Sequence, residues 1–206
     1  MILSRSEKLP ESVTAQLLET ARILEVFAEE GMETVSQAAR LIADSMKKGG
    51  KLLLCGNGGS AADCQHLAAE FVCRLSAQRE RRALPALALT TDTSFLTAFC
   101  NDYCFDDVFA RQVEALGRPG DSLLAISTSG ASENVRRALR LANEMGLDTI
   151  ALTRRGGAVG GMSKISIEVE AEETAIIQNV HIALEHVLCA LVEEMLLDGN
   201  QRLGGM

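Results

Sequence analysis

Residues 52–60 read LLLCGNGGS: apolar residues typical of a buried strand lead directly into a turn rich in glycine, and a helical pattern follows. Residues 123–132 read LLAISTSGAS and repeat this order, with serine and threonine in the turn. Glycine lets the backbone approach a ligand closely, and the free N–H groups at the start of a helix attract an anion. Hydroxyl groups donate hydrogen bonds to phosphate oxygens. The two stretches together predict the two halves of one site for a phosphorylated sugar.

For either stretch alone, the alternative is an ordinary strand-to-helix turn in which glycine bends the chain and serine caps the helix. Nucleotide-binding motifs fit poorly. A dinucleotide fingerprint needs a third glycine at position 61, where the chain has Ala61, and the Gly-Lys-Ser/Thr ending of a P-loop is missing. The later glycine-rich segment, residues 156–161, is interpreted as a connection and not as a second phosphate-binding turn.

Short apolar runs alternate with helical patterns on both sides of the two stretches. Strands are predicted at residues 51–55, 86–89, 122–126, 149–152 and 165–169, and helices at residues 61–75, 94–101, 107–116, 133–145 and 174–197. This alternation is typical of a parallel sheet covered on both faces. The chain is therefore predicted to be α/β, a single doubly wound domain with about five parallel strands flanked by helices. Ligands are expected beyond the carboxyl ends of the strands.

Residues 1–50 are expected to form a helical hairpin within the same domain, and residues 51–200 are expected to form its sugar-phosphate-binding part. Apolar positions at helical spacing predict one helix over residues 11–30, ended by Gly31, and a second over residues 32–48. Two helices before the first strand cover a sheet edge poorly, which favours packing of the hairpin against another subunit.

The composition limits the possible partners. The 206 residues suit one domain, and 47% hydrophobic but only 3% aromatic residues predict an aliphatic core. A net charge of −8 argues against a nucleic-acid partner, which needs a clustered basic face. The one basic cluster, Arg79, Arg81 and Arg82, is interpreted as a solvated loop.

The sequence also predicts a cytoplasmic protein without a membrane partner. The N-terminus lacks the apolar core of a secretory signal, and no apolar run reaches the ~20 residues that span a bilayer. The six cysteines form no Cys-x-x-Cys pair and are expected to be reduced and largely buried thiols, although Cys100 and Cys104 could be neighbours on a helical turn.

Two histidine-containing helices carry the candidates for chemistry. His66 and Glu70 are four residues apart, so both side chains can converge and either share a divalent metal ion or transfer protons; the alternative is a surface ion pair. Gln178 and His186 are eight residues apart, about 80° around a helix and ~12 Å along it. They cannot both bind one ion from an undistorted helix of one chain. Either Gln178 lies at a frayed helix start or one of the two reaches across a subunit boundary, while His181 is expected to be a helix-surface histidine.

Several motifs in order resemble one family. They are GNGGSAAD at residues 56–63, QHLAAE at 65–70, LTTDTS at 89–94, ND at 101–102, RQVEALG at 111–117 and ISTSG at 126–130. Over residues 32–194 the chain resembles the sedoheptulose 7-phosphate isomerases, also called phosphoheptose isomerases, of the sugar-isomerase (SIS) domain superfamily. The resemblance implies a homotetramer with sites between subunits. It also implies the conversion of D-sedoheptulose 7-phosphate to D-glycero-D-manno-heptose 7-phosphate, an early step of bacterial heptose biosynthesis.

The same resemblance implies roles for individual residues. Glu70 would be the base and His186 its acid partner, and one zinc ion per subunit would be held by His66, Glu70, Gln178 and His186. Since a metal-bound carboxylate is a weaker base, the resemblance leaves open whether Glu70 both binds zinc and removes a proton. Substrate contacts would fall on Asn57, Gly58, Gly59, Ser60, Glu70, Arg74, Asn101, Asp102, Ser127, Thr128, Ser129, Ser132 and Gln178.

One departure and one alternative remain. The family commonly has arginine and glutamate where this chain has Ile176 and Asn179, which puts the fine substrate specificity in doubt. The alternative function is a non-catalytic SIS-domain adaptor that binds the replication initiator protein. Such adaptors typically lack an acidic residue at the position of Glu70 and a histidine at that of His186. Both are present here, which favours the isomerase, and zinc that copurifies with the protein would distinguish the two.

Overall fold

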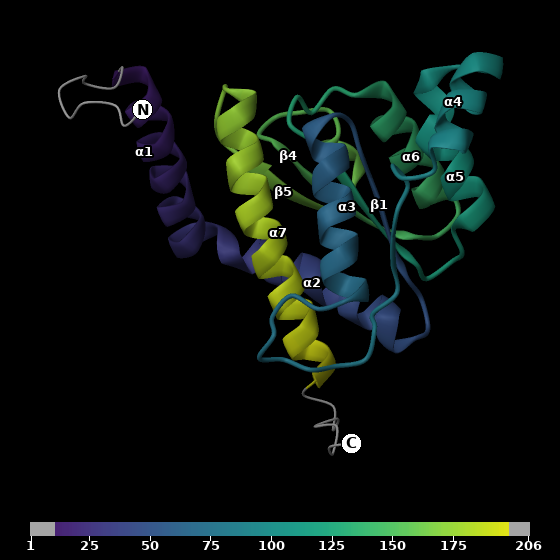
Figure 1. The fold of residues 1–206 in the computed structure, drawn as a ribbon, viewed down its shortest axis with the longest axis horizontal. Helices are drawn as coiled ribbons and strands as arrows, with labels where there is room; N and C mark the ends of the chain where they lie inside the picture. Colours follow the sequence, from purple (N-terminus) through teal and green to yellow (C-terminus); the bar gives the residue numbers. More distant parts are fainter. Residues whose placement is uncertain (1–10, 198–206) are drawn as a thin grey trace, which may run out of the picture.

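The computed structural model describes residues 11–197 (Figure 1). The N-terminal residues on which the expectation about a secretory signal rests, and residues 198–200 of the predicted domain, lie outside the described residues. Five parallel strands form one sheet in the order β2-β1-β3-β4-β5. The strands are β1 (Leu52–Gly56), β2 (Ala86–Ala88), β3 (Ser122–Ser127), β4 (Asp148–Arg154) and β5 (Ile165–Val169). All five predicted strands are confirmed, within two residues at each end.

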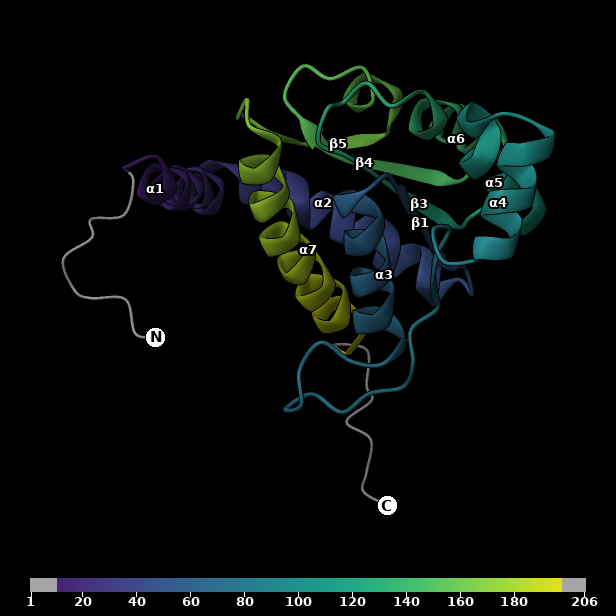
Figure 2. The same cartoon turned by 45° about the horizontal axis from the view of Figure 1, so that its top comes forward.

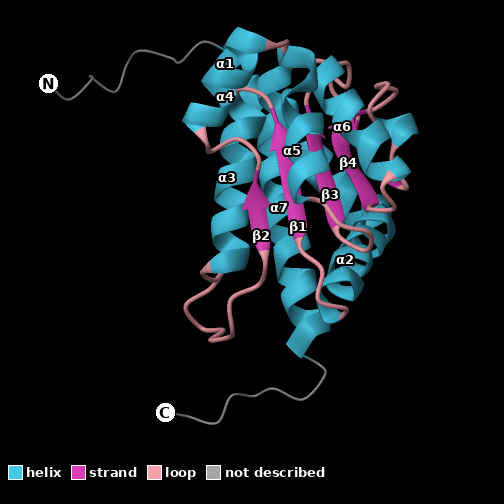
Figure 3. Ribbon diagram, turned by 90° about the vertical axis from the view of Figure 1, so that its right-hand side faces the viewer, coloured by secondary structure: helices cyan, strands magenta, loops and turns pink. Residues whose placement is uncertain are grey.

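Helices cover both faces of this sheet (Figure 3). One face carries α2 (Met32–Lys47), α3 (Gly59–Val72) and α7 (Thr174–Leu197); the other carries α4 (Thr93–Asp102), α5 (Val108–Leu116) and α6 (Glu133–Glu144). Side chains alternate between the faces along each strand, so Leu52 and Leu54 join the first cluster, and Leu53 and Cys55 join the second. The predicted doubly wound α/β fold is confirmed.

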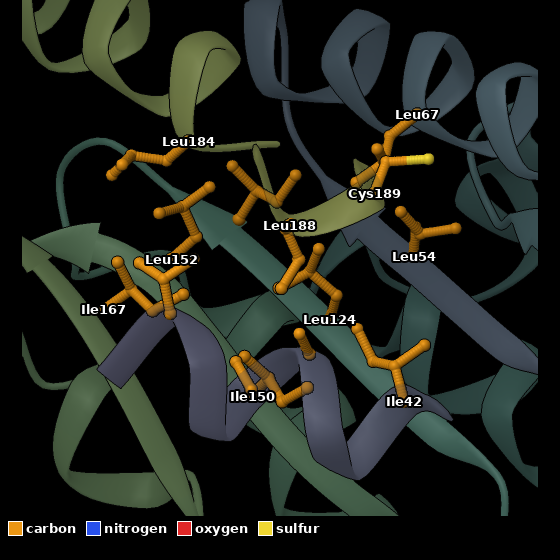
Figure 4. Packing of buried hydrophobic residues seen from close by; sticks show 14 of the residues in the cluster. Ile42, Leu54, Leu67, Leu124, Ile150, Leu152, Ile167, Leu184, Leu188 and Cys189 are labelled. Carbon is orange, nitrogen blue, oxygen red and sulfur yellow. The ribbon is translucent and has the colours of Figure 1, made fainter. Parts of the chain in front are cut away.

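The cluster between the sheet and α2, α3 and α7 is aliphatic, as the composition predicts. Leu54, Leu124 and Ile150 project from three strands and meet Ile42 of α2 and Leu188 of α7 (Figure 4). All five side chains are at most 1% exposed. Burial of each such side chain contributes about 1.5–3 kcal/mol relative to leaving it in water. This packing holds α7 against the sheet, with α3 beside it (Figure 2).

The N-terminal helices differ from the predicted hairpin. The chain stays helical from α1 (Glu11–Val26) through a π-helical turn (Phe27–Gly31) into α2, and α2 runs away from α1 instead of folding back beside it. Gly31 was expected to end the first helix. Its backbone keeps right-handed helical angles (φ −95°, ψ −12°), and a side chain there would lie 2.3 Å from the Phe27 ring. This glycine therefore makes room for an aromatic ring and does not terminate the helix.

Two further interpretations from the sequence were wrong. Arg81 does not lie in a solvated loop: its side chain is 3% exposed and pairs with Glu193. The cysteines are only half buried as a set, because Cys73, Cys100 and Cys104 are exposed. All six are free thiols in the structure.

Among the described residues, α7 is the one helix long and apolar enough to cross a membrane, with a mean hydropathy of 1.6 over an 18-residue window. Half of that window is buried inside the fold. The helix packs against α2 and α3 and supplies Leu184, Leu188 and Val192 to the core. Its apolar composition is therefore explained by its place in the interior.

Candidate functional site

The two turns predicted to bind phosphate lie side by side at the carboxyl ends of β1 and β3. These strands are neighbours in the sheet, with Gly56 opposite Ile126. The amides of Asn57, in the first turn, and Asn134, in the first turn of α6, join them: each side-chain nitrogen donates to the other side chain's oxygen at 2.9 Å. Asn134 was not predicted, because its partner is 77 residues away.

Two glycines of the first turn are required by its geometry. Gly58, which precedes α3, has φ +56°, a conformation that residues with a side chain rarely adopt. At Gly59, a Cβ atom would lie 2.5 Å from both polar atoms of the Gln178 amide. The first turn is therefore open at Gly58 and in close contact with α7 at Gly59. Ser60, the next residue, is buried.

The second turn brings three hydroxyl groups together. The Oγ of Ser127 lies 3.3 Å from that of Ser132 and 3.4 Å from that of Ser129, and it accepts a hydrogen bond from the backbone N–H of Gly130. Ser132 precedes α6 but its side chain does not cap the helix. The N–H of Val135 donates to the Oδ1 of Asn134, so the N–H groups of Glu133 and Asn134, next to Ser132, are the ones left for an anion. Thr128, between Ser127 and Ser129 in the sequence, is half-buried.

The glycine-rich segment at residues 156–161 supports the second turn. The N–H of Val159 donates to the carbonyl of Gly130 at 3.0 Å, and a Cβ atom on Gly130 would lie 2.6 Å from the Cα of Gly157. The segment is a connection, as predicted, and it packs against Gly130 of the second turn. Gly130 itself has φ +66°.

Helices α3 and α7 lie side by side and run in the same direction, since Gln178 contacts the start of α3, His186 its middle and Glu193 its end. The Nε2 atoms of His66 and His186 are 2.8 Å apart, and the Oε1 of Glu70 is 3.7 Å from the Nε2 of His66. The three side chains predicted for chemistry therefore converge within one chain.

Gln178 joins the same two helices, α3 and α7, at a point nearer their N-termini than the His66–His186 contact. Its Nε2 lies 3.1 Å from both carboxylate oxygens of Asp63, a residue that the sequence analysis did not select. Helix α7 begins at Thr174, so Gln178 is not at a frayed start. Burial raises the pKa of Asp63, while the hydrogen bond from Gln178 and the charge of His66 act in the opposite direction.

The donor set fits a transition-metal ion, although no ready-made group of three such ligands is found within residues 11–197. The Oε2 of Glu70 is buried and has no hydrogen-bond partner among the described residues. The two facing imidazole nitrogens cannot both be protonated at this separation. An unpaired carboxylate oxygen beside two such nitrogens is the oxygen–nitrogen chemistry that zinc and its neighbours bind.

His181 was predicted to be a surface histidine, which is wrong. Its side chain is completely buried, one helical turn from the equally buried Glu185. Burial lowers the pKa of His181 to about 4 and raises that of Glu185 to about 8, the second with a smaller contribution from Asp63. Both residues are therefore uncharged near neutral pH. The apolar positions around them on α7 gave no sign of buried polar groups.

Comparison with known proteins agrees with this geometry. The model of the SIS domain family matches residues 17–154. The phosphoheptose isomerase of Nitratidesulfovibrio vulgaris is 49% identical over 94% of this chain and 92% of its own length, and that of Aquifex aeolicus is 51% identical over 91% and 98%. The chain belongs to the phosphoheptose isomerase family. The structure of phosphoheptose isomerase GmhA from Neisseria gonorrhoeae superposes with a TM-score of 0.82 at 45% identity, over 89% of this chain and 98% of that one.

Membership of the phosphoheptose isomerase family makes this protein a sugar-phosphate isomerase. Three residues that the resemblance assigned to substrate make no hydrogen bond to the rest of the site among the described residues. On the exposed end of α4, Asn101 donates to Asp102 at 2.8 Å, and Arg74 pairs with Glu80 at 2.9 Å. Within the described residues, none of the three bonds to the two turns or to His66, Glu70 or His186.

Ile176 and Asn179, where this chain departs from the phosphoheptose isomerase pattern on α7, differ in their surroundings. Ile176 is 6% exposed and belongs to the hydrophobic core, whereas Asn179 is exposed. Ile176 also lines a cavity of about 350 Å³ together with Glu19 and Glu173, on the side of α1. The isoleucine stands where the family commonly has arginine, and this position does not belong to either of the turns that follow β1 and β3.

Proposed function

We propose that this isomerase interconverts D-sedoheptulose 7-phosphate and D-glycero-D-manno-heptose 7-phosphate, an early step of bacterial heptose biosynthesis. The observation that carries the proposal is the convergence of His66, Glu70 and His186 beside two turns suited to phosphate. The names of the relatives agree with this substrate class.

The phosphate group is assigned to the second turn. Ser127, Ser129 and Ser132 offer hydroxyl donors, and the start of α6 offers free N–H groups and the positive end of the helix dipole. Thr128 adds a further hydroxyl group. The first turn contributes backbone N–H groups at Gly58, Gly59 and Ser60, together with the Asn57 amide. This grip fixes the far end of the sugar, so that its carbonyl end extends toward α3 and α7.

The proton transfers are assigned to Glu70 and His186. The ketose carries its carbonyl at C2, and isomerisation removes a proton from C1, passes through an enediol and returns a proton to C2. Glu70 takes the C1 proton on its unpaired Oε2 and, once the enediol has formed, gives a proton back to C2. His186 moves a proton from the C1 hydroxyl group to the C2 oxygen, so charge and atoms balance in the overall reaction.

We further propose one zinc ion per subunit. His66, Glu70 and His186 of one chain would hold it. Because α7 is a regular helix from Thr174 onward, the fourth ligand, Gln178, would come from a neighbouring subunit. When bound, zinc would polarise the carbonyl group of the substrate and hold the two proton-transferring groups in place. Glu70 and His186 remain the groups that transfer the protons.

Assembly into a homotetramer with sites between subunits is also proposed. Helix α1 leaves large apolar side chains in solvent, with Leu17 68% and Leu18 66% exposed. Arg74, Asn101 and Asp102 make no hydrogen bond to the site within the described residues of one chain, which supports their use at a neighbouring chain's site. The three exposed free thiols support a reducing, cytoplasmic location.

The decisive experiment incubates the purified protein with sedoheptulose 7-phosphate in deuterated water. We expect an aldose product labelled at C2, because the proton that is returned exchanges with solvent. Glu70→Gln is expected to lower turnover by at least about 10²–10⁴-fold while the oligomer stays intact. The initiator-binding adaptor predicts neither product nor label, and full turnover by Glu70→Gln would contradict the mechanism.

A further inference from the structure

In the contact between Asp63 and Gln178, the amide nitrogen of Gln178 is the donor and the carboxylate of Asp63 is the acceptor. Asp63 lies in the second turn of α3 and is 6% exposed, and Gln178 reaches it from α7. An ionised carboxylate only accepts hydrogen bonds, whereas a carboxamide has one accepting and one donating end. The end that faces Asp63 must therefore be Nε2, as the 3.1 Å distances to both oxygens show.

The amide is also confined on a second side. A Cβ atom at Gly59 would lie 2.5 Å from both Nε2 and Oε1 of Gln178, so the amide packs directly on the backbone of the first turn. Asp63 on one side and Gly59 on the other leave Oε1 as the free polar atom. Within the described residues, this oxygen accepts no hydrogen bond.

We propose that Asp63 is a positioning residue: it holds the Gln178 carboxamide so that Oε1 is the atom available as a zinc ligand. The inference rests on the proposed zinc site. An amide turned the other way would present N–H groups, which cannot bind a cation. Asp63 thus fixes the orientation of the Gln178 amide, so that its accepting oxygen and not its donating nitrogen is free.

The zinc affinity of the purified protein tests this without any measurement of turnover. The metal is removed and zinc is titrated back against a chromogenic chelator. Asp63→Asn keeps the shape but allows its amide to pair with Gln178 in either orientation, so we expect zinc affinity to fall by about 10–100-fold. Asp44→Asn, which removes one exposed carboxylate from α2, is the matched control and is expected to bind zinc as the wild type does.

A reversed pair provides the rescue. In Asp63→Asn/Gln178→Glu the amide is on α3 and donates to a carboxylate on α7, which leaves an accepting oxygen free. Gln178→Glu alone places two carboxylates in contact and is expected to lower the melting temperature of the metal-free protein. Adding Asp63→Asn is expected to restore both the melting temperature and zinc affinity. This coupling remains measurable even where one single variant folds poorly.

The outcomes separate this inference from the proposed reaction. Wild-type zinc affinity in a folded Asp63→Asn protein, or additive effects of the two substitutions, would overturn the positioning role while the isomerase function stands. A wild-type protein that binds no zinc would overturn it as well, and turnover of the sugar phosphate by that metal-free protein would leave the reaction in place. Loss of zinc affinity with rescue, in a protein that does not isomerise, would support the positioning role and refute the reaction.

Discussion

The guanidinium group of Arg81 pairs with the carboxylate of Glu193 at 2.6 Å, and the two side chains are 3% and 1% exposed. Arg81 also donates to the backbone carbonyls of Glu70 at 2.7 Å and Phe71 at 2.9 Å. The last carbonyl groups of a helix have no partner within the helix. Arg81 therefore completes the end of α3, which carries Glu70, and attaches it to α7, which carries His186.

Arg81→Met is expected to lower the free energy of unfolding by about 3–5 kcal/mol, because Glu193 would remain buried without its partner. Chemical denaturation measures this change. Arg74→Met is the control: its pair with Glu80 is exposed, so its loss is expected to change stability by less than about 1 kcal/mol. Arg81→Met/Glu193→Met should recover only part of the loss, and full recovery would show that the carbonyl contacts contribute nothing.

Ser127→Ala and Ser132→Ala are expected to raise KM for the sugar phosphate by about 10-fold or more each, since a hydrogen bond to a charged group contributes about 1.5–3 kcal/mol. Steady-state kinetics measure KM and kcat separately. We expect kcat to change less, because the serines hold the end of the substrate that does not react. Ser163→Ala, outside the two turns, serves as the matched control. A KM equal to that of the wild type in both variants would remove the phosphate from this turn.

Gly130→Ala is expected to destabilise the protein by about 1–3 kcal/mol. The new methyl group would meet the Cα of Gly157 at 2.6 Å, and the backbone angle φ +66° is itself unfavourable for alanine. Because Gly130 also shapes the second turn, activity should fall with stability. Gly161→Ala places its methyl group in open space and is expected to be neutral. Thermal unfolding of the two variants, measured side by side, checks the difference.

The buried Glu185 predicts an unusual pH dependence of stability. Its pKa of about 8 lies above the usual value of 4.5, so between these values the folded protein holds a proton that the unfolded chain has released. Stability is therefore lost as pH rises, by up to about 1.4 kcal/mol per pH unit. His181 acts oppositely between pH 4 and 6.5, where only the unfolded chain is protonated. The two effects overlap below pH 6.5, and the net loss is expected between pH 6.5 and 8.

Glu185→Gln removes the first titration. Its stability relative to the wild type should rise from about pH 4.5 to 8 and then stay constant, as measured by urea unfolding at each pH, because His181 titrates in both proteins. In His181→Asn the compensating titration is lost, so the decrease of stability due to Glu185 should begin at about pH 4.5 and not at pH 6.5. Parallel stability curves for Glu185→Gln and the wild type would show that Glu185 is ionised in the folded state.

The sheet, its order of elements and the two phosphate-type turns could be predicted from the sequence because they depend on local patterns. An apolar run of four residues with glycine or serine after it identifies both a buried strand and the turn that follows. His66 and Glu70 were found for the same reason, since their contact needs only a spacing of four on one helix. Convergence with His186 then followed from the resemblance to the family.

The residues that the sequence analysis missed are those whose roles depend on distant partners. Asp63 was missed because its partner Gln178 is 115 residues away, and Asn134 because its partner Asn57 is 77 residues away. Nothing near Asp63 distinguishes it from an ordinary polar residue of a helix. Gly31 shows the opposite error, because a glycine at the end of a helical pattern is usually a stop signal and here accommodates Phe27.

The reciprocal amide pair of Asn57 and Asn134 has a consequence for binding. Separating the two turns would break both hydrogen bonds and leave the two amide nitrogens and the Oδ1 of Asn57 without their partners, so the turns behave as one rigid unit before any ligand arrives. Their conformational entropy is lost when the chain folds, and little of it remains to be lost at binding. The site is thus preorganised, and its affinity for the sugar phosphate is not reduced by a need to order the backbone around it.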